Sequence, residues 1–316
     1  MTKDVFLRTF TPSDLPEVLS VLKAALGESP VLRRTPALWA WKHEQNPFGP
    51  SLVLLAEKEG RIAGVRALMR WDLDMPNGSR LRCLRAVDTA THPDFERQGI
   101  FSRLTTAALD NAREQGYDLI FNTPNERSGA GYLKMGWGIV GAIGVMIRPL
   151  LGAGRRVDEE AAPDPEHYFS ATEVLPASLP DLRPPRGLRT PRTEAYLEWR
   201  FRAHPYVSYI TVTAGSCMAV ARPNLRKGRK EVVVSDLLGL ASGKAVRMLA
   251  RRSRAHYLAG WFSPGSPERT AAILGGMLPI PGMQSLTLVA NPLRQLPLDV
   301  FDASNWDLAM SDLELL

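Results

Sequence analysis

Apolar and polar residues alternate along several short stretches of this chain of 316 residues, and this alternation predicts strands. Residues 52–56 and 62–71 are typical of the two arms of a hairpin with its turn at 58–61, and residues 81–91 form a longer apolar strand. Residues 101–115 instead carry apolar side chains at helical spacing. The chain therefore mixes strands and helices within one compact region.

The same signals predict the other elements of the N-terminal half. Thr11 to Asp14 has the composition of a helix cap, so a helix is expected directly after it. The further elements are a strand at 5–10, helices at 15–25 and 36–43, a strand at 119–122, a helix at 129–134 and a strand at 139–147. The order β-α-α-β-β-β-α-β-α-β predicts an α/β (α+β) fold class with a mixed, mostly antiparallel central sheet flanked by helices.

Landmarks of the first half recur in the second. Residues 34–47 share an Arg-Thr pair, a tryptophan followed by a basic residue, and a proline with residues 192–205. Residues 121–136 share a proline and a glycine at equal spacing with residues 261–276. Because these matches stay in the same order, they favour duplication of one fold unit over chance.

The two copies are not equal, since Ala272 stands where the first copy has Tyr132. We expect a first domain at 1–150, a linker at 151–164, and a degenerate second domain at 165–316. Residues 168–182 are expected to supply the shortened opening strand and helix of the second copy.

Composition and charge narrow the class of protein. Charged residues make up 23% of the chain and hydrophobic residues 45%, which is typical of a globular protein. Neither a secretory signal nor a membrane span is predicted, because residues 1–10 carry charges and the run at 270–293 contains three prolines. Two cysteines, Cys83 and Cys217, predict neither a disulfide framework nor a metal site. A cytoplasmic location is the natural expectation.

The net charge of +6 suits an anionic ligand. The densest basic cluster, at 222–230, contains Pro223 and Gly228, so a hairpin tip is favoured over a nucleic-acid patch and nucleic acid is not expected as a partner.

Candidate chemistry begins at Gly99, which lies directly before the helix predicted at 101–115. Backbone N–H groups and the positive end of the helix dipole converge at such a start, and a glycine keeps side chains away from them. The segment predicts a phosphate-binding loop. Asn125, Tyr132, Gly136 and Trp137 follow the next strand.

These two segments resemble the GNAT acyltransferase superfamily, whose members transfer an acyl group from acyl-CoA to an amine. In the family signature Gln/Arg-x-x-Gly-x-Gly/Ala, only Gly99 matches here, while Glu96 and Phe101 depart from it. The second segment fits the family pattern from Asn125 to Trp137 without a gap. The resemblance covers residues 5–150 well and residues 165–293 in outline.

The resemblance implies acetyl-CoA, or another acyl-CoA, as co-substrate and no metal. It implies that Tyr132 is the general acid, and a phenol pKa of about 10 suits protonation of a thiolate whose thiol has a pKa of about 8.5. The residues expected to bind the cofactor are Thr89, Ala90, Thr91, Arg97, Gln98, Gly99, Ile100, Phe101, Ser102 and Asn125.

An acceptor ammonium has a pKa of about 10.4, so it must lose a proton before it attacks. Asp88 on the central strand is a candidate catalytic base, and a structural hydrogen-bonding role for it is equally supported. His92 and Glu126 compete for the same task. The expected partner is a small-molecule amine, and the oligomeric state is left open.

A further cluster of Trp39, Trp41, His43 and Asn46 lies where acceptors approach in this superfamily, although Trp199 in the second copy indicates that Trp41 is structural. The amino-acid sequences of several segments resemble those of bacterial GNAT proteins of surface-polysaccharide synthesis, and this resemblance suggests an amino-sugar acceptor. Two alternatives remain: a Fem-type aminoacyl-tRNA-dependent transferase, to which only the basic cluster points, and a non-catalytic GNAT-like binding protein.

Overall fold

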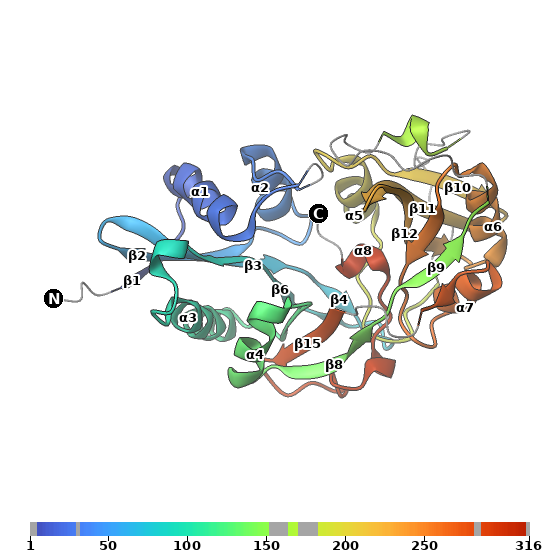
Figure 1. Ribbon diagram of the computed structural model, residues 1–316. Coiled ribbons are helices and arrows are strands. Elements are labelled where there is room, and N and C mark those ends of the chain that lie inside the picture. Colours follow the sequence, from blue (N-terminus) through green and yellow to red (C-terminus); the bar gives the residue numbers. More distant parts are fainter. Residues whose placement is uncertain (1–4, 30–31, 152–163, 170–182, 281–285, 314–316) are drawn as a thin grey trace. The chain divides into compact units, whose positions relative to one another are not determined.

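The computed structural model describes residues 5–29, 32–151, 164–169, 183–280 and 286–313 (Figure 1). These residues form two compact units. The first contains 1–73, 80–140 and 288–301, and the second contains 74–79, 141–287 and 302–316. Nearly all of the expected linker at 151–164 and most of 168–182 lie outside the described residues.

The first unit is built on a seven-stranded sheet with the order β1-β2-β3-β6-β7-β15-β8. Its neighbours from β1 to β6 pair antiparallel, β6 and β7 pair parallel, and β7 and β15 pair antiparallel. The strands are β1 (Phe6–Thr9), β2 (Leu52–Lys58), β3 (Arg61–Arg70), β6 (Cys83–Thr91), β7 (Leu119–Asn122), β8 (Gly138–Ile143) and β15 (Leu286–Pro292). A separate small pair joins β4 (Leu73–Asp74) and β5 (Arg80–Leu81).

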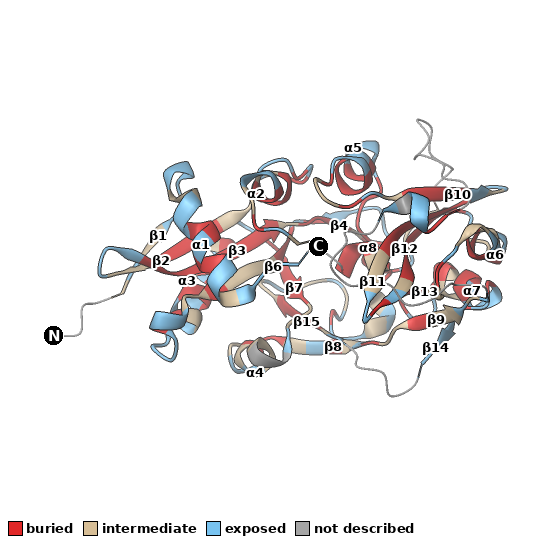
Figure 2. Ribbon diagram, turned by 45° about the horizontal axis from the view of Figure 1, so that its top comes forward, coloured by how far each residue is buried: buried red, intermediate tan, exposed pale blue. Residues whose placement is uncertain are grey.

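Helices cover both faces of this sheet. Figure 1 shows α1 (Leu15–Leu26) and α2 (Pro36–His43) over one face and α3 (Ile100–Glu114) and α4 (Glu126–Lys134) over the other. Two clusters of buried apolar residues correspond to these faces, one with α1 and one with α3. The buried central strands stand out in Figure 2. The predicted mixed α/β class is confirmed.

Close packing of α3 on β3 depends on Gly64. A Cβ atom there would lie 2.7 Å from Cγ2 of Ile100 and 3.0 Å from Cδ1 of Leu104. Since real Cβ atoms do not approach so closely, the glycine lets the start of α3 rest on the strand. The position of this helix start matters because the predicted phosphate loop lies directly before it.

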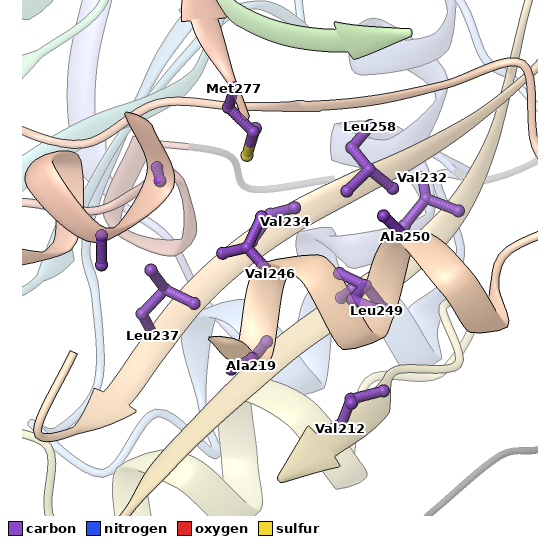
Figure 3. Packing of buried hydrophobic residues seen from close by; sticks show 14 of the residues in the cluster. Val212, Ala219, Val232, Val234, Leu237, Val246, Leu249, Ala250, Leu258 and Met277 are labelled. Carbon is purple, nitrogen blue, oxygen red and sulfur yellow. The ribbon is translucent and has the colours of Figure 1, made fainter. Parts of the chain in front are cut away.

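The second unit repeats the strand pairing of the first. Its six-stranded sheet has the order β10-β11-β12-β13-β9-β14, with β12 and β13 parallel and the other pairs antiparallel. Its strands are β9 (Met146–Pro149), β10 (Ile210–Ala214), β11 (Cys217–Arg226), β12 (Arg229–Gly239), β13 (Tyr257–Gly260) and β14 (Leu278–Pro279). Its helices are α5 (Glu194–Leu197), α6 (Gly243–Arg252), α7 (Pro267–Leu274) and α8 (Met310–Leu313). Figure 3 shows Val246, Leu249 and Ala250 of α6 packed over the buried strands.

In each sheet a hairpin is followed by one antiparallel strand, one parallel strand and one further antiparallel strand. This shared order is consistent with a duplicated unit. In each sheet this last antiparallel strand comes from the other half of the sequence. β15, from the second half, pairs with β7 in the first sheet, and β9, from the first half, pairs with β13 in the second. A cut at residue 150 would separate both strands from the sheets they join.

The single strand predicted at 139–147 is wrong, because it is two strands. β8 ends at Ile143 in the first sheet, and β9 begins at Met146 in the second. A continuous apolar pattern does not reveal which sheet each half joins. The hairpin predicted within the basic cluster at 222–230 is present, since Arg226 pairs with Arg229 across a turn at Lys227 and Gly228, but Arg222 at the start of the cluster is buried in β11.

Both cysteines are buried free thiols. Among the helices within the described ranges, none is long and apolar enough to cross a membrane.

Candidate active site

The central feature of the first unit is a strand, β6, with one edge left open. On one side, β6 pairs with β3 as far as Thr91. On the other, it pairs with β7 only from Cys83 to Arg85. Within the described strands, the backbone from Ala86 to Thr91 therefore has N–H and C=O groups on one edge without a strand partner. An extended amide-containing ligand can pair with such an edge as an added strand does.

A β-bulge shapes this edge. Val65 pairs with Ala90 and Ala67 pairs with Val87, so Asp88 and Thr89 together stand opposite Arg66. Asp88 has a φ of +41°, an uncommon backbone conformation for a residue other than glycine. Bulges of this kind redirect side chains, and here the neighbouring Asp88 and Thr89 take entirely different partners.

The predicted phosphate loop has the expected backbone. Gly99 is the N-cap of α3 and has a φ of +73°, and Arg97 has a φ of +61°. A Cβ atom on Gly99 would meet no other atom within 4 Å, so the space beside it is open. The first turn of α3, with Ile100, Phe101 and Ser102, offers N–H groups that have no acceptor inside the helix. Such left-handed residues before a helix form an anion-binding concavity.

Of the side chains near this loop, Gln98 lies on the surface and Phe101 packs against Tyr132. Gln98 accepts a hydrogen bond from Nζ of Lys58 on the surface. Phe101, which departs from the family signature, lies edge-on to the Tyr132 ring at 5.6 Å between centroids. A Cβ on Gly131 would lie 3.0 Å from the Phe101 ring, so Phe101 packs closely on α4. The Phe101 side chain thus lies in contact with Tyr132 while its backbone belongs to the predicted phosphate loop.

Tyr132 is buried, with 3% of its surface exposed. Its hydroxyl oxygen accepts a hydrogen bond of 2.6 Å from Nη1 of Arg66, and the same Nη1 donates to Oγ1 of Thr89 at 2.9 Å. Trp137 supports the other side of the ring at 5.0 Å between centroids. Arg66 therefore places the tyrosine hydroxyl beside the open part of β6.

Asn125 is the N-cap of α4. Its Oδ1 accepts hydrogen bonds from the backbone N and the hydroxyl of Ser128, at 3.0 and 2.9 Å. This cap fixes the start of the helix that carries Tyr132. It also occupies the side-chain carbonyl oxygen of Asn125, which leaves the side-chain NH₂ to donate to a ligand.

Asp88 is the centre of a buried ion cluster. Its carboxylate accepts from Nη1 of Arg34 at 3.1 Å, from Nζ of Lys42 at 2.9 Å and from Nε2 of His43 at 3.0 Å. All four side chains are at most 10% exposed. They line a small cavity with Trp39 beneath α2.

The charges of this cluster determine its proton affinity. Burial alone would raise the pKa of Asp88, but Lys42, His43 and Arg34 outweigh it and hold that pKa well below the ordinary 3.8. Burial lowers the pKa of His43 below 6.5, with partial compensation from Asp88. Neutral His43 then donates Nε2–H to Asp88 and accepts at Nδ1 from the Ser51 hydroxyl at 2.9 Å.

These contacts favour the structural interpretation of Asp88 over the catalytic one, because a carboxylate that binds protons so weakly is a poor base. His92 is also engaged, since its Nδ1 accepts the backbone N–H of Asp94 at 3.2 Å. The Glu126 side chain lies outside the described part of the chain.

The tryptophan cluster of the sequence is largely core. Trp39 and Trp41 are 3% and 1% exposed, and Trp39 packs on the His43 ring at 4.1 Å between centroids. Asn46 donates to the backbone oxygen of Arg70. These residues hold α2 on the sheet.

The second unit contains a counterpart of the Asp88 cluster. Arg192 occupies the repeat position of Arg34, and it pairs with Asp236 on β12 at 2.8 Å and with Asp312 at 2.8 Å. In both units a buried arginine just before a helix pairs with an aspartate on a strand of the sheet, which indicates a role in the fold. Tyr132 has no such counterpart, because Ala272 lies in an apolar cluster.

Two residues of the site, Arg66 and Lys42, were not predicted from the sequence. Arg66 interrupts the apolar run of β3, and this lone charge in a central strand was a usable signal. Lys42 belongs to the repeated segment as the basic residue after Trp41, but a lysine at the end of a short helix gives no sign of a buried ion pair.

Comparison with known proteins extends this picture. A profile of the acetyltransferase (GNAT) domain family matches residues 7–140. No curated protein gives a significant match. The solved structures similar to this chain include a GCN5-related N-acetyltransferase from Anabaena variabilis, with 12% identity, a TM-score of 0.63 and coverage of 92% of this chain and 73% of that one.

Two further structures are similar. Eis1 from Mycobacterium abscessus has 17% identity and a TM-score of 0.60, with 92% of this chain and 74% of that chain covered. A putative acetyltransferase from Pyrococcus horikoshii has 12% identity and a TM-score of 0.54, with 96% and 92% covered. At these identities the likeness shows the fold. Together with the domain match, it shows that residues 7–140 belong to the GNAT acetyltransferase superfamily.

Proposed function

We propose that this protein is an acyl-CoA-dependent N-acyltransferase whose active site lies in the first unit. The observation that carries the proposal is the open edge of β6 from Ala86 to Thr91, with the Tyr132 hydroxyl held beside it through Arg66. The pantetheine arm pairs with this edge by its amides. The diphosphate binds the N–H groups at Gly99 and the first turn of α3.

The reaction proceeds by direct attack. The amine nitrogen adds to the thioester carbonyl carbon, and collapse of the tetrahedral intermediate breaks the C–S bond. The sulfur leaves with the bonding electron pair and takes the proton of Tyr132. The amine loses one proton to water, and the tyrosine recovers its proton from solvent, so the products are an amide and CoA thiol.

Asp88 acts indirectly in this proposal. With Arg34, Lys42 and His43 it fixes the bulge of β6, and this bulge turns Thr89 toward Arg66. The acceptor is a small-molecule amine. Amino sugars are the first class to test, because segments of the sequence resemble GNAT proteins of polysaccharide synthesis.

Steady-state kinetics test this function. CoA thiol release from acetyl-CoA would be followed with a panel of amino sugars, amino acids and polyamines. Tyr132→Phe is expected to lower kcat about 100-fold or more while the KM for acetyl-CoA changes less than about threefold. The ring contacts of Tyr132 with Phe101 and Trp137 remain in this variant.

Tyr117→Phe is the matched control. Tyr117 is also buried in the first unit, and its ring packs against Arg82 rather than the open edge of β6. It should retain full activity. If Tyr132→Phe retains full activity as well, the proposed role of Tyr132 is wrong, and absence of any acetyl-CoA turnover or binding by the wild type would refute the proposed function.

A further inference from the structure

Arg66 is a buried cation without an anion. None of its surface is exposed, and no carboxylate among the described residues forms an ion pair with it. Its Nη1 uses both hydrogens, one toward Thr89 and one toward Tyr132. Its Nε is buried without an acceptor in the described part of the chain. A buried unpaired charge is unfavourable in itself, so its presence needs a cause.

The fold does not supply that cause. In the second unit β11 has the place in the sheet that β3 has in the first, and its residues in the cluster beneath α6 are Cys217, Ala219 and Ala221. Figure 3 shows Ala219 among these apolar neighbours. On this face of the sheet the second unit thus has small apolar side chains, whereas the buried Arg222 of β11 lies outside this cluster. On this face, arginine is present in the unit that has the tyrosine, and small apolar residues take its place in the unit where alanine replaces the tyrosine.

We propose that Arg66 is a positioning residue for the acid step, and that it stabilises the negative charge that passes between the CoA sulfur and the Tyr132 oxygen. This inference rests on the proposed acyl-CoA function. An arginine can only donate, so the Tyr132 oxygen accepts from Arg66 and its own hydrogen is directed elsewhere. The geometry therefore leaves the phenol proton available to the leaving sulfur.

The charges balance through the step. As the C–S bond breaks, the sulfur takes the electron pair and the tyrosine proton, and the negative charge moves to the phenolate oxygen. That oxygen is 2.6 Å from Nη1 of Arg66, and the guanidinium carbon lies 5.1 Å from the ring centre. A charged hydrogen bond already formed in the ground state stabilises the phenolate without reorganisation. Solvent then returns a proton to Tyr132.

Arg66→Met provides the test, because methionine fills similar space without charge. We expect kcat for acetyl transfer to fall about 10- to 100-fold, with the KM for acetyl-CoA changed less than about threefold. The melting temperature should stay level or rise, since an unpaired buried charge is removed. Arg113→Met, at an exposed arginine paired with Asp110 on α3, is the matched control and should change neither.

A second measurement needs no acceptor amine, because it follows the ionisation of the thiol of bound CoA. The ultraviolet absorbance of the thiolate of bound CoA would be titrated with pH in the wild type and in Arg66→Met. If the guanidinium stabilises negative charge at this site, half-ionisation of the bound thiol occurs at least about one pH unit higher in the variant. In a double-variant cycle with Tyr132→Phe, the two losses in kcat should be far from additive.

The outcomes separate the two claims. Absence of CoA binding by the wild type would remove the proposed function, and this inference with it. Binding and turnover by the wild type, with Arg66→Met fully active and its thiol titration unchanged, would refute only the role of Arg66. A lower melting temperature with unchanged kcat would assign Arg66 to the fold and overturn the proposal.

Discussion

Replacing Asp88 by asparagine tests whether the buried ion cluster holds the first unit together. The substitution keeps the shape of the side chain and removes the anion that pairs with both Arg34 and Lys42. Both cations are almost fully buried, at 6% and 4% exposure of their side chains. We expect a large loss of stability because two charges would remain in the protein interior without a counter-ion.

The size of the loss follows from the distances. At 3.1 and 2.9 Å, and with an effective dielectric constant of about 20, each ion pair contributes about 5 kcal/mol of attraction. The desolvation of the three charges costs several kcal/mol for each ion and offsets much of this. Breaking such a pair by removing one partner typically costs about 3–5 kcal/mol, which is the loss expected for Asp88→Asn.

Urea denaturation followed by tryptophan fluorescence measures this change, since Trp39 packs directly on His43. Asp110→Asn is the control, because Asp110 is 61% exposed and pairs with Arg113 on the surface. That variant should lose less than about 0.5 kcal/mol. A loss below about 1 kcal/mol for Asp88→Asn would show that the cluster does not hold the fold.

Three further predictions concern stability. Gly64→Val should destabilise the first unit by about 1–3 kcal/mol in urea denaturation and weaken acetyl-CoA binding, since its Cβ would lie 2.7 Å from Ile100; unchanged values would show that α3 can shift freely. Because burial lowers the pKa of His43, the unfolded chain binds more protons just below pH 6.5, so the urea midpoint should fall as the pH drops from 7 to 5, less so in His43→Gln; equal slopes would contradict this. Arg192→Met leaves Asp236 and Asp312 buried without their cation, which raises their pKa values, so the variant should lose more stability at pH 7 than at pH 4; a loss independent of pH would contradict it.

Local patterns were sufficient for much of the fold and part of the candidate site. The glycine that opens α3 and the spacing from Asn125 to Trp137 are features of contiguous residues, so Gly99 and Tyr132 could be found without the structure. Helices α1, α2 and α3 begin within one residue of their predicted starts, because caps and apolar periodicity are also local.

Long-range pairing could not be predicted in the same way. The Asp88 partners lie 45 to 54 residues away, and Arg66 lies 66 residues from Tyr132. Which of Asp88's two interpretations holds depends on those partners. The apolar run at 139–147 likewise gives no sign of the break between β8 and β9 or of the two different sheets that these strands join.

The central claim is that the first unit binds acyl-CoA at Gly99, and calorimetry with acetyl-CoA tests it most directly. Wild type, Gly99→Glu and Gly215→Glu would be compared. Gly215, at a φ of +63° in the β10–β11 turn, has open space around it as Gly99 does, so its variant controls for strain and added charge. The account predicts micromolar binding by the wild type and Gly215→Glu and none by Gly99→Glu. Equal binding by all three folded proteins, or no binding by the wild type, would contradict it.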